Sequence, residues 1–247
     1  MKNKGKLWVL GMGPGRREEM TLEALAVLER VEIICGYKVY NELLREDFPE
    51  KEYLSSGMRQ ELQRVEMALE RAQAGAEIAL VSSGDSGIYG LASLSLELAP
   101  RYPDVEIEIV PGLTAALTGA ARLGAPLGHD SCLISLSDLL TPWELIEKRL
   151  EAAALGDFAI VLYNPASRKR PDYPKLATEI LLKAAKAPET PCAAVRNIGR
   201  EGEESWFFRL AELPEQELDM FCTVFIGNSQ TQMIAGRMVT PRGYRHA

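Results

Sequence analysis

Histidine is almost absent from this sequence, and its cysteines are not clustered. His129 and His246 are the only histidines in 247 residues, and the four cysteines lie far apart with no Cys-x-x-Cys pair. Zinc and iron–sulfur sites need clustered ligands of these types, so we expect no metal held by the protein alone. Scattered single thiols are typical of reduced cysteines, so we expect a cytoplasmic protein.

Basic residues are also in deficit. Lys and Arg number 28 against 35 Asp and Glu, which gives a formal net charge of −7. Proteins that coat nucleic acids or bind anionic membranes carry an excess of basic residues, so we expect neither partner. The apolar run at residues 7–12 is short and runs into glycine and proline, so we expect neither a signal peptide nor a membrane anchor.

Apolar runs alternate with amphipathic segments in the first half of the chain. We predict helices at 22–31, capped by Thr21, and at 58–74, 88–99 and 113–123. Strands are predicted between them at 7–12, 31–35, 78–82 and 105–110. Repeated strand–helix units indicate a mostly parallel sheet covered by helices.

The second half is less regular. Strands are predicted at 132–136, 158–163, 191–196, 205–210 and 220–226, with a helix at 173–187. Another helix begins with Thr141 as its cap, Pro142 in the first position and Glu144 completing a capping box. The last two strands lack a long helix between them, which favours antiparallel pairing. We therefore predict two α/β domains, residues 1–123 and 129–247, joined by a linker at 124–128.

Three glycine-bearing loops follow predicted strands, at residues 11–15, 82–90 and 111–116. Such loops at the carboxyl ends of strands form ligand crevices. The first loop is not a dinucleotide fingerprint, because Arg16 stands where the third glycine is needed, and this disfavours a nicotinamide oxidoreductase. Asp85 in the second loop either binds a ligand ammonium or hydroxyl group or caps the helix expected from Ile88.

Polar clusters follow predicted strands of the second half. Arg168, Lys169 and Arg170 form either a binding site for a polyanion or a solvated loop. Asp138 follows another strand. His129 has no accompanying serine or cysteine elbow, which disfavours a nucleophilic triad.

Together these segments resemble the tetrapyrrole (corrin/porphyrin) methyltransferase family, which uses S-adenosylmethionine. The resemblance rests on G-x-G-P-G at 11–15, G-D-x-x-x-Y-G at 84–90, P-G-x-T-A at 111–115 and G-N at 227–228. Ser86 stands where the family usually has proline. Residues 134–143 and 163–170 are similar to the branch that methylates C17 of precorrin-3B.

The resemblance implies two α/β domains with the active site in the cleft between them, usually as a homodimer. It also implies which residues bind S-adenosylmethionine. These are Pro14, Ser83, Gly84, Asp85, Ile88, Thr114 and Ala115, with Asn164 and Gly199 from the second domain.

The implied reaction, a step of cobalamin biosynthesis, methylates C17 of precorrin-3B or cobalt-precorrin-3 and contracts the ring to precorrin-4 or its cobalt form. Asp138 is the first candidate for the general base, with Asp85 and His129 behind it. The alternatives are another corrinoid methyltransferase (C11, C20 or C2) and a non-catalytic tetrapyrrole-binding module. The cations expected to pair with substrate carboxylates are Arg168, Lys169, Arg170, Arg196 and Arg200.

Overall fold

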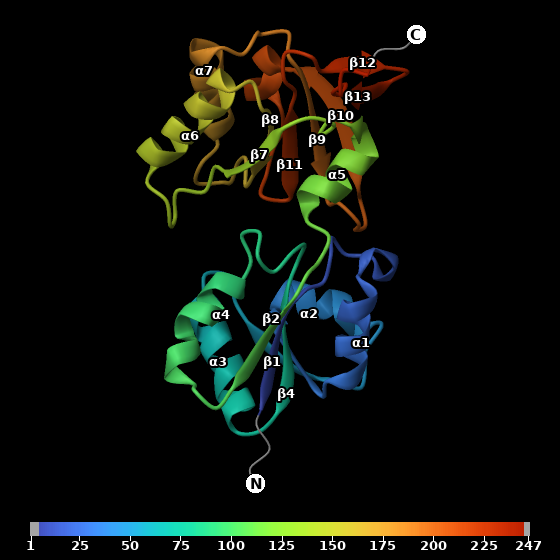
Figure 1. The fold of residues 1–247 in the computed structure, drawn as a ribbon, viewed down its shortest axis with the longest axis vertical. Coiled ribbons are helices and arrows are strands. Elements are labelled where there is room, and N and C mark those ends of the chain that lie inside the picture. The colour runs from blue at the N-terminus through green and yellow to red at the C-terminus, as the bar shows by residue number, and fades with distance from the viewer. Residues whose placement is uncertain (1–4, 245–247) are drawn as a thin grey trace. The chain divides into compact units, whose positions relative to one another are not determined.

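The structure, a computed structural model, describes residues 5–244. Residues 1–4 lie outside the described range. They begin the segment that we expect to be neither a signal peptide nor a membrane anchor. The chain divides into two compact units, Met1–Ala115 and Ala116–Ala247 (Figure 1). This division falls after the first residue of the helix at 115–123, whereas the predicted boundary follows the whole helix. Within residues 5–244, no helix is long and apolar enough to cross a membrane.

The first unit contains a five-stranded sheet in the order β3-β2-β4-β1-β5, in which every pairing is parallel. Its strands are β1 (Lys6–Gly11), β2 (Ile33–Tyr37), β3 (Glu52–Ser56), β4 (Glu77–Ser82) and β5 (Glu106–Val110). Its helices are α1 (Leu22–Arg30), α2 (Lys38–Arg45), α3 (Glu61–Gln73) and α4 (Ala92–Leu98). The predicted α/β class and the mostly parallel sheet are confirmed.

Helices cover both faces of this sheet. Figure 1 shows α1 and α2 on one face and α3 and α4 on the other. Trp8 and Leu10 of β1 pack with α1 and α2, whereas Leu7 and Val9 pack with α3 and α4. Successive side chains of a strand point to opposite faces, so a strand buried on both sides is continuously apolar. Each fully buried Leu or Val contributes about 1.5–3 kcal/mol to stability.

Local signals explain most boundaries in this unit. The predicted cap of α1 is confirmed, because Thr21 Oγ1 accepts a hydrogen bond from the amide of Ala24 at 3.1 Å. The helix expected from Ile88 instead begins at Ala92, since residues 86–91 form a loop around Asp85. The sequence interpretation missed α2 and β3.

The second unit contains a mixed sheet in the order β10-β9-β11-β8-β7. Its strands are β7 (Ser131–Ser135), β8 (Ala159–Tyr163), β9 (Pro191–Arg196), β10 (Glu204–Arg209) and β11 (Cys222–Ile226). A small second sheet joins β12 (Gln232–Ile234), β13 (Arg237–Val239) and β6 (Gly124–Ala125). Its helices are α5 (Ala115–Leu123), α6 (Trp143–Leu155) and α7 (Tyr173–Ala184).

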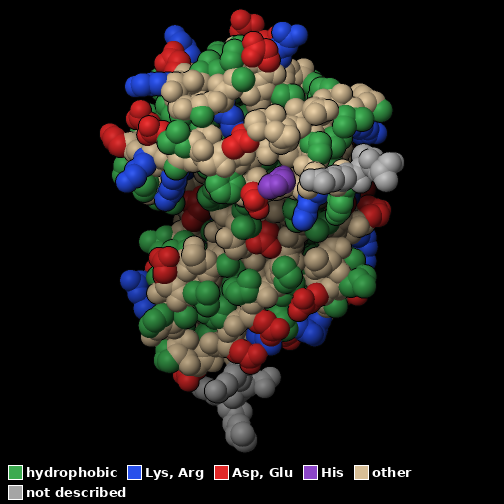
Figure 2. Space-filling model, turned by 45° about the horizontal axis from the view of Figure 1, so that its top comes forward, with side chains coloured by type: hydrophobic (Ala, Val, Ile, Leu, Met, Phe, Trp, Pro, Cys, Tyr) green, Lys and Arg blue, Asp and Glu red, His purple; other side chains and the backbone are tan. Residues whose placement is uncertain are grey.

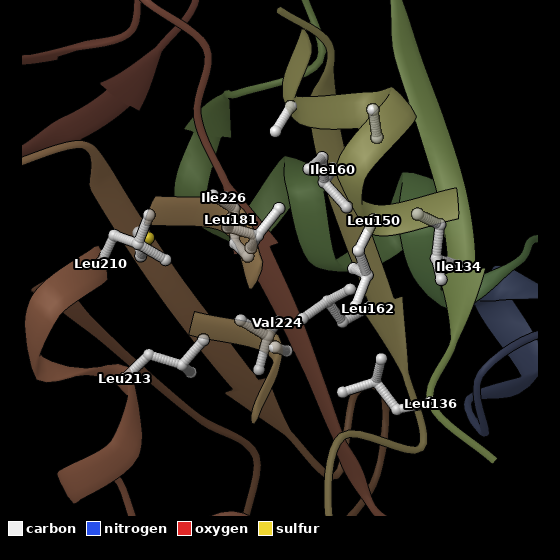
Figure 3. Close-up of a cluster of buried hydrophobic side chains, with 14 of the residues drawn as sticks. Ile134, Leu136, Leu150, Ile160, Leu162, Leu181, Leu210, Leu213, Val224 and Ile226 are labelled. Atoms are coloured by element: carbon white, nitrogen blue, oxygen red, sulfur yellow. The ribbon is translucent and has the colours of Figure 1, made fainter. Parts of the chain in front are cut away.

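The core of the second unit lies between the mixed sheet and helices α6 and α7. Leu150 of α6 and Leu181 of α7 meet Leu162 and Val224 of the sheet in this cluster (Figure 3). Small residues bring α5 close to the sheet: a Cβ atom added at Gly119 would lie 2.7 Å from Phe225 Cζ.

Three expectations for the second unit need correction. Strands β10 and β11 do not pair with each other; each is antiparallel to β9, which lies between them. The predicted linker contributes β6, which pairs with β13. The N-cap position of α6 is Pro142 and not Thr141, because Pro142 is extended and its carbonyl accepts from the amide of Leu145. Within residues 5–244, no side chain caps this helix.

Candidate functional site

The three glycine loops of the first unit meet at one edge of its sheet. They follow β1, β4 and β5, which are neighbours in the order β4-β1-β5 with parallel pairing. Gly13 and Gly84 exchange two backbone hydrogen bonds, at 3.0 and 2.7 Å. The carboxyl ends of these strands therefore form one continuous surface of loop backbone.

Glycine is required where these loops approach each other. A Cβ atom at Gly11 would lie 2.6 Å from Gly84 O, and one at Gly112 would lie 2.5 Å from Gly11 O. Gly13 and Gly84 also have φ angles of +70° and +71°, which favour glycine. Side chains are thus excluded from the centre of the loops.

Asp85 holds two of the loops together. Its Oδ1 accepts hydrogen bonds from the amides of Gly87 and Ile88 at 2.8 and 3.1 Å, and its Oδ2 accepts from Gly112 at 2.9 Å. The carboxylate therefore shapes the second loop and fastens it to the third, and it does not cap α4. This contact joins residues far apart in sequence, so no local pattern predicts it.

Ser86 stabilises the same junction. Its side chain is buried, and Oγ donates to Val110 O at 3.3 Å, at the end of β5. Serine in the place of the usual proline thus adds a link from the second loop to β5.

The predicted cofactor residues of the first unit all belong to these three loops. The first loop contains Pro14, the second contains Ser83, Gly84, Asp85 and Ile88, and the third contains Thr114 and Ala115. Thr21, the cap of α1, donates to Pro111 O at 3.3 Å and so secures the third loop.

Asn164 and Gly199 lie in the second unit, after β8 and β9. Asn164 has a φ of +50°, and its Nδ2 donates to Ser135 Oγ at 3.1 Å. Gly199 has a φ of +69°, and its amide donates to Glu203 Oε2 at 2.6 Å. Both residues therefore stand in turns that need a left-handed backbone.

Tyr163, which the sequence interpretation did not single out, precedes Asn164. Its hydroxyl accepts a hydrogen bond from the amide of Ala116 at 2.9 Å, in the first turn of α5. Because α5 follows the third loop directly, Tyr163 fixes the start of the helix that continues this loop. The sequence feature that could have identified Tyr163 is its position directly before Asn164 and Pro165, in the family-like segment at 163–170.

Asp138 lies in a polar cluster after β7. Tyr173 donates its hydroxyl to Oδ2 at 2.7 Å, and Arg170 Nη1 lies 3.4 Å from Oδ1. This hydrogen bond and the burial of the phenol raise the pKa of Tyr173. The Trp143 ring packs 4.5 Å from the Tyr173 ring, and the Asp138 side chain remains 35% exposed. Asp138 is thus held in a fixed orientation while still open to solvent.

His129 is separated from Asp138 by the length of a strand. It precedes β7, whereas Asp138 follows that strand. The His129 side chain lies at the surface, in purple in Figure 2, and is 49% exposed. Its Nδ1 accepts a hydrogen bond from the amide of Asp130 at 2.8 Å. The structure does not bring the two candidate bases of this unit together.

The five predicted cations have different surroundings. Arg196 forms ion pairs with Glu204 and Asp219 and donates to Glu217 O, so its charge is already matched within the chain. Arg168 and Lys169 are exposed in a turn closed by Ser167 and Arg170. Arg200 continues the loop after β9, where its amide donates to Asn197 O.

In the part of the chain that is described, no group of three or more His, Cys, Asp or Glu residues is placed to hold a metal ion.

Comparisons with known proteins match nearly the whole chain. A family model described as Tetrapyrrole (Corrin/Porphyrin) Methylases matches residues 6–214. A Salmonella typhimurium protein named "Probable cobalt-factor III C(17)-methyltransferase" is 47% identical over 239 residues, covering 96% of this chain and 99% of that protein. The Priestia megaterium "Cobalt-factor III methyltransferase" is 43% identical over 247 residues, covering 98% of this chain and 46% of that longer protein.

A solved structure agrees with these relatives. The crystal structure of the methyltransferase CobJ has a TM-score of 0.88 and 38% identity, covering 96% of this chain and 100% of that one. The resemblance based on the glycine-loop motifs is confirmed. The chain belongs to the tetrapyrrole (corrin/porphyrin) methylases.

Proposed function

We propose that this protein is an S-adenosylmethionine-dependent C-methyltransferase of cobalamin biosynthesis, which methylates C17 of a precorrin-3-type tetrapyrrole with contraction of the ring. The observation that carries the proposal is the 47% identity, over nearly the full length of both chains, to a protein named for C(17) methylation. Both relatives described above are named for cobalt-factor III. We therefore propose the cobalt-bearing substrate, with metal-free precorrin-3B as the alternative.

The loops of the first unit fit S-adenosylmethionine. The Cβ positions at Gly11 and Gly112 are filled by neighbouring backbone, so a ligand at this edge meets amides and carbonyls and few side chains. When bound, the cofactor supplies a methyl group on a positively charged sulfur, which is already activated for transfer. We propose that the loop residues Pro14, Ser83, Gly84, Asp85, Ile88, Thr114 and Ala115 form this site, with Asn164 and Gly199 contributing from the second unit.

The remaining task of the protein is positioning. An activated methyl donor needs no covalent nucleophile from the enzyme, so alignment of the reacting atoms and exclusion of water provide most of the rate. A new bond forms between the methyl carbon and C17 while the bond from carbon to sulfur breaks. The loop contacts of Asp85, Ser86 and Tyr163 hold the backbone rigid for this purpose.

Ring contraction also releases a proton, and we propose that Asp138 accepts it. Tyr173 and Arg170 orient its carboxylate, and its partial exposure leaves room for a substrate. Asp85 is a weaker candidate, because three backbone amides already bind its carboxylate. His129 stays a reserve candidate.

Cations near Asp138 are proposed to bind the carboxylates of the macrocycle. Arg168 and Lys169 are exposed and flank Arg170, which contacts Asp138. Arg200 is proposed with them, and Arg196 would first have to exchange its internal acid partners. A homodimer in the cytoplasm completes the proposal; light scattering on the purified protein tests the dimer.

The experiment is turnover followed by mass spectrometry. The protein is incubated with S-adenosylmethionine and either cobalt-factor III or precorrin-3B, and the products are weighed. We expect S-adenosylhomocysteine together with a methylated, ring-contracted macrocycle. Methylation at C11, C20 or C2 would show another corrinoid methyltransferase, and binding without S-adenosylhomocysteine would show a non-catalytic binding module.

A further inference from the structure

A buried arginine in the first unit has no acid partner among the residues that the structure describes. Arg64, in the first turns of α3, is 4% exposed. Its Nε donates to Ser56 Oγ at 2.8 Å, its Nη2 donates to Gly57 O at 2.9 Å, and its guanidinium lies 5.8 Å from the centre of the Tyr37 ring. All of these partners are uncharged. Among residues 5–244, Nη1 has no hydrogen-bond partner and the guanidinium has no ion pair. Buried charges are almost always paired, so this side chain needs an explanation.

The strand register places a second unsatisfied group on the same face of the sheet, two strands away from Ser56. Tyr37 of β2 is paired in register with Ser56 of β3. On the other side of β2, Gly36 is paired with Val81 of β4. The next residues along these two strands, Tyr37 and Ser82, are therefore also level. Cys35 and Leu80, two residues earlier, face α3 and α4, so Ser56, Tyr37 and Ser82 point to that same face. Ser82 Oγ is buried and has no hydrogen-bond partner in the part of the chain that the structure describes. Hydroxyl-bearing side chains of three neighbouring strands thus lie on one face of the sheet. Arg64 contacts this row through Ser56, and its Nη1 still lacks an acceptor among the described residues.

We propose that Arg64 and Ser82 form a subsite for one carboxylate of the tetrapyrrole substrate. Arg64 offers Nη1, and Ser82 offers its hydroxyl; both donate to an anionic oxygen. Guanidinium groups match the planar geometry of carboxylates and form the stronger, charge-assisted hydrogen bonds. The proposal rests on the function proposed above, which supplies a substrate that carries carboxylates.

The position of the subsite favours the substrate over the cofactor as the source of the carboxylate. Ser82 directly precedes the second glycine loop, so the subsite adjoins the proposed cofactor site. Arg64 and Ser56, however, lie against β2 and β3, away from the β4-β1-β5 centre where the three loops meet. The backbone carbonyl of Gly57 contacts the guanidinium, so Arg64 lies directly beneath the exposed turn at 57–60.

Equilibrium binding of a stable tetrapyrrole tests the subsite without turnover. Uroporphyrin III, which carries carboxylates around its rim, is titrated by fluorescence into the wild-type protein and into Arg64→Gln, Ser82→Ala and Arg71→Gln variants. Arg71 is the matched control, because it lies on the same helix, is exposed and pairs with Glu52. S-adenosylhomocysteine binding to each variant is measured by calorimetry.

We expect the Kd of uroporphyrin III to rise about tenfold or more in Arg64→Gln, as loss of a charge-assisted hydrogen bond predicts. It should rise several-fold in Ser82→Ala and stay at the wild-type value in Arg71→Gln. Affinity for S-adenosylhomocysteine should not change. Because the Ser82 hydroxyl has no partner among the residues described, its removal should preserve folding. This variant therefore decides the question if Arg64→Gln does not fold.

Unchanged uroporphyrin affinity in Ser82→Ala and in any folded Arg64→Gln protein would overturn the subsite. A parallel loss of S-adenosylhomocysteine affinity would also overturn it and would assign the carboxylate to the cofactor. A wild-type protein that binds uroporphyrin III through Arg64 but gives no turnover would refute the proposed function while leaving the subsite standing.

Discussion

Replacing Asp85 by asparagine is the sharpest test of how the loops are held. The two carboxylate oxygens accept three backbone hydrogen bonds, two at Oδ1 and one at Oδ2. Asparagine has nearly the same shape but only one acceptor oxygen. If that oxygen keeps Gly87 and Ile88, the amide NH2 faces the N–H of Gly112, and two donors oppose each other.

The expected cost follows from the bond that is lost. A hydrogen bond to a charged group contributes about 1.5–3 kcal/mol, so Asp85→Asn should lower the free energy of unfolding by about that amount. The second and third loops should also separate, so the affinity for S-adenosylhomocysteine should fall by roughly tenfold, since 1.4 kcal/mol corresponds to a factor of ten.

Urea denaturation and calorimetric titration measure the two effects. Asp104→Asn is the matched control, because Asp104 is an exposed aspartate of the same unit. The control should behave as the wild type in both assays. Wild-type stability together with wild-type cofactor affinity in Asp85→Asn would refute the role assigned to this carboxylate.

Three further predictions concern the loops, the proposed base and the thiols. Gly112→Ala should abolish S-adenosylhomocysteine binding in calorimetry, because the new Cβ would lie 2.5 Å from Gly11 O; wild-type affinity would contradict the close approach of the loops. Tyr173→Phe should lower kcat about tenfold while the KM for S-adenosylmethionine stays constant, because only the orientation of Asp138 is lost; an unchanged kcat in steady-state assays would count against this role. Burial raises the pKa of Cys35 to about 12 and that of Cys132 to about 11, so both thiols should resist a thiol reagent at pH 8 and react after unfolding in urea; rapid labelling of the folded protein would contradict this.

Most of the fold could be predicted from the sequence because the buried strands are recognisable as short apolar runs. Strands β1, β4 and β9 are apolar runs that end in glycine or polar loops, and Thr21 marks the start of α1 with a side-chain cap. The missed elements lack these signals. Among the described residues, no side chain caps helix α2, and β3 is a largely polar strand at the edge of the sheet.

The candidate site was also predicted only in part. Glycine spacing identified the three loops, since close backbone approach excludes side chains and leaves a visible pattern. The contacts that position them escaped prediction. Asp85 to Gly112, Tyr163 to Ala116 and Arg64 to Ser56 depend on strand order and register, which a single sequence does not specify.

A crystal structure with S-adenosylhomocysteine tests the central claim most directly. The account predicts the ligand against the backbone of Gly84 and Gly112, at the carboxyl ends of β4, β1 and β5. Electron density for the ligand away from all three glycine loops would contradict it.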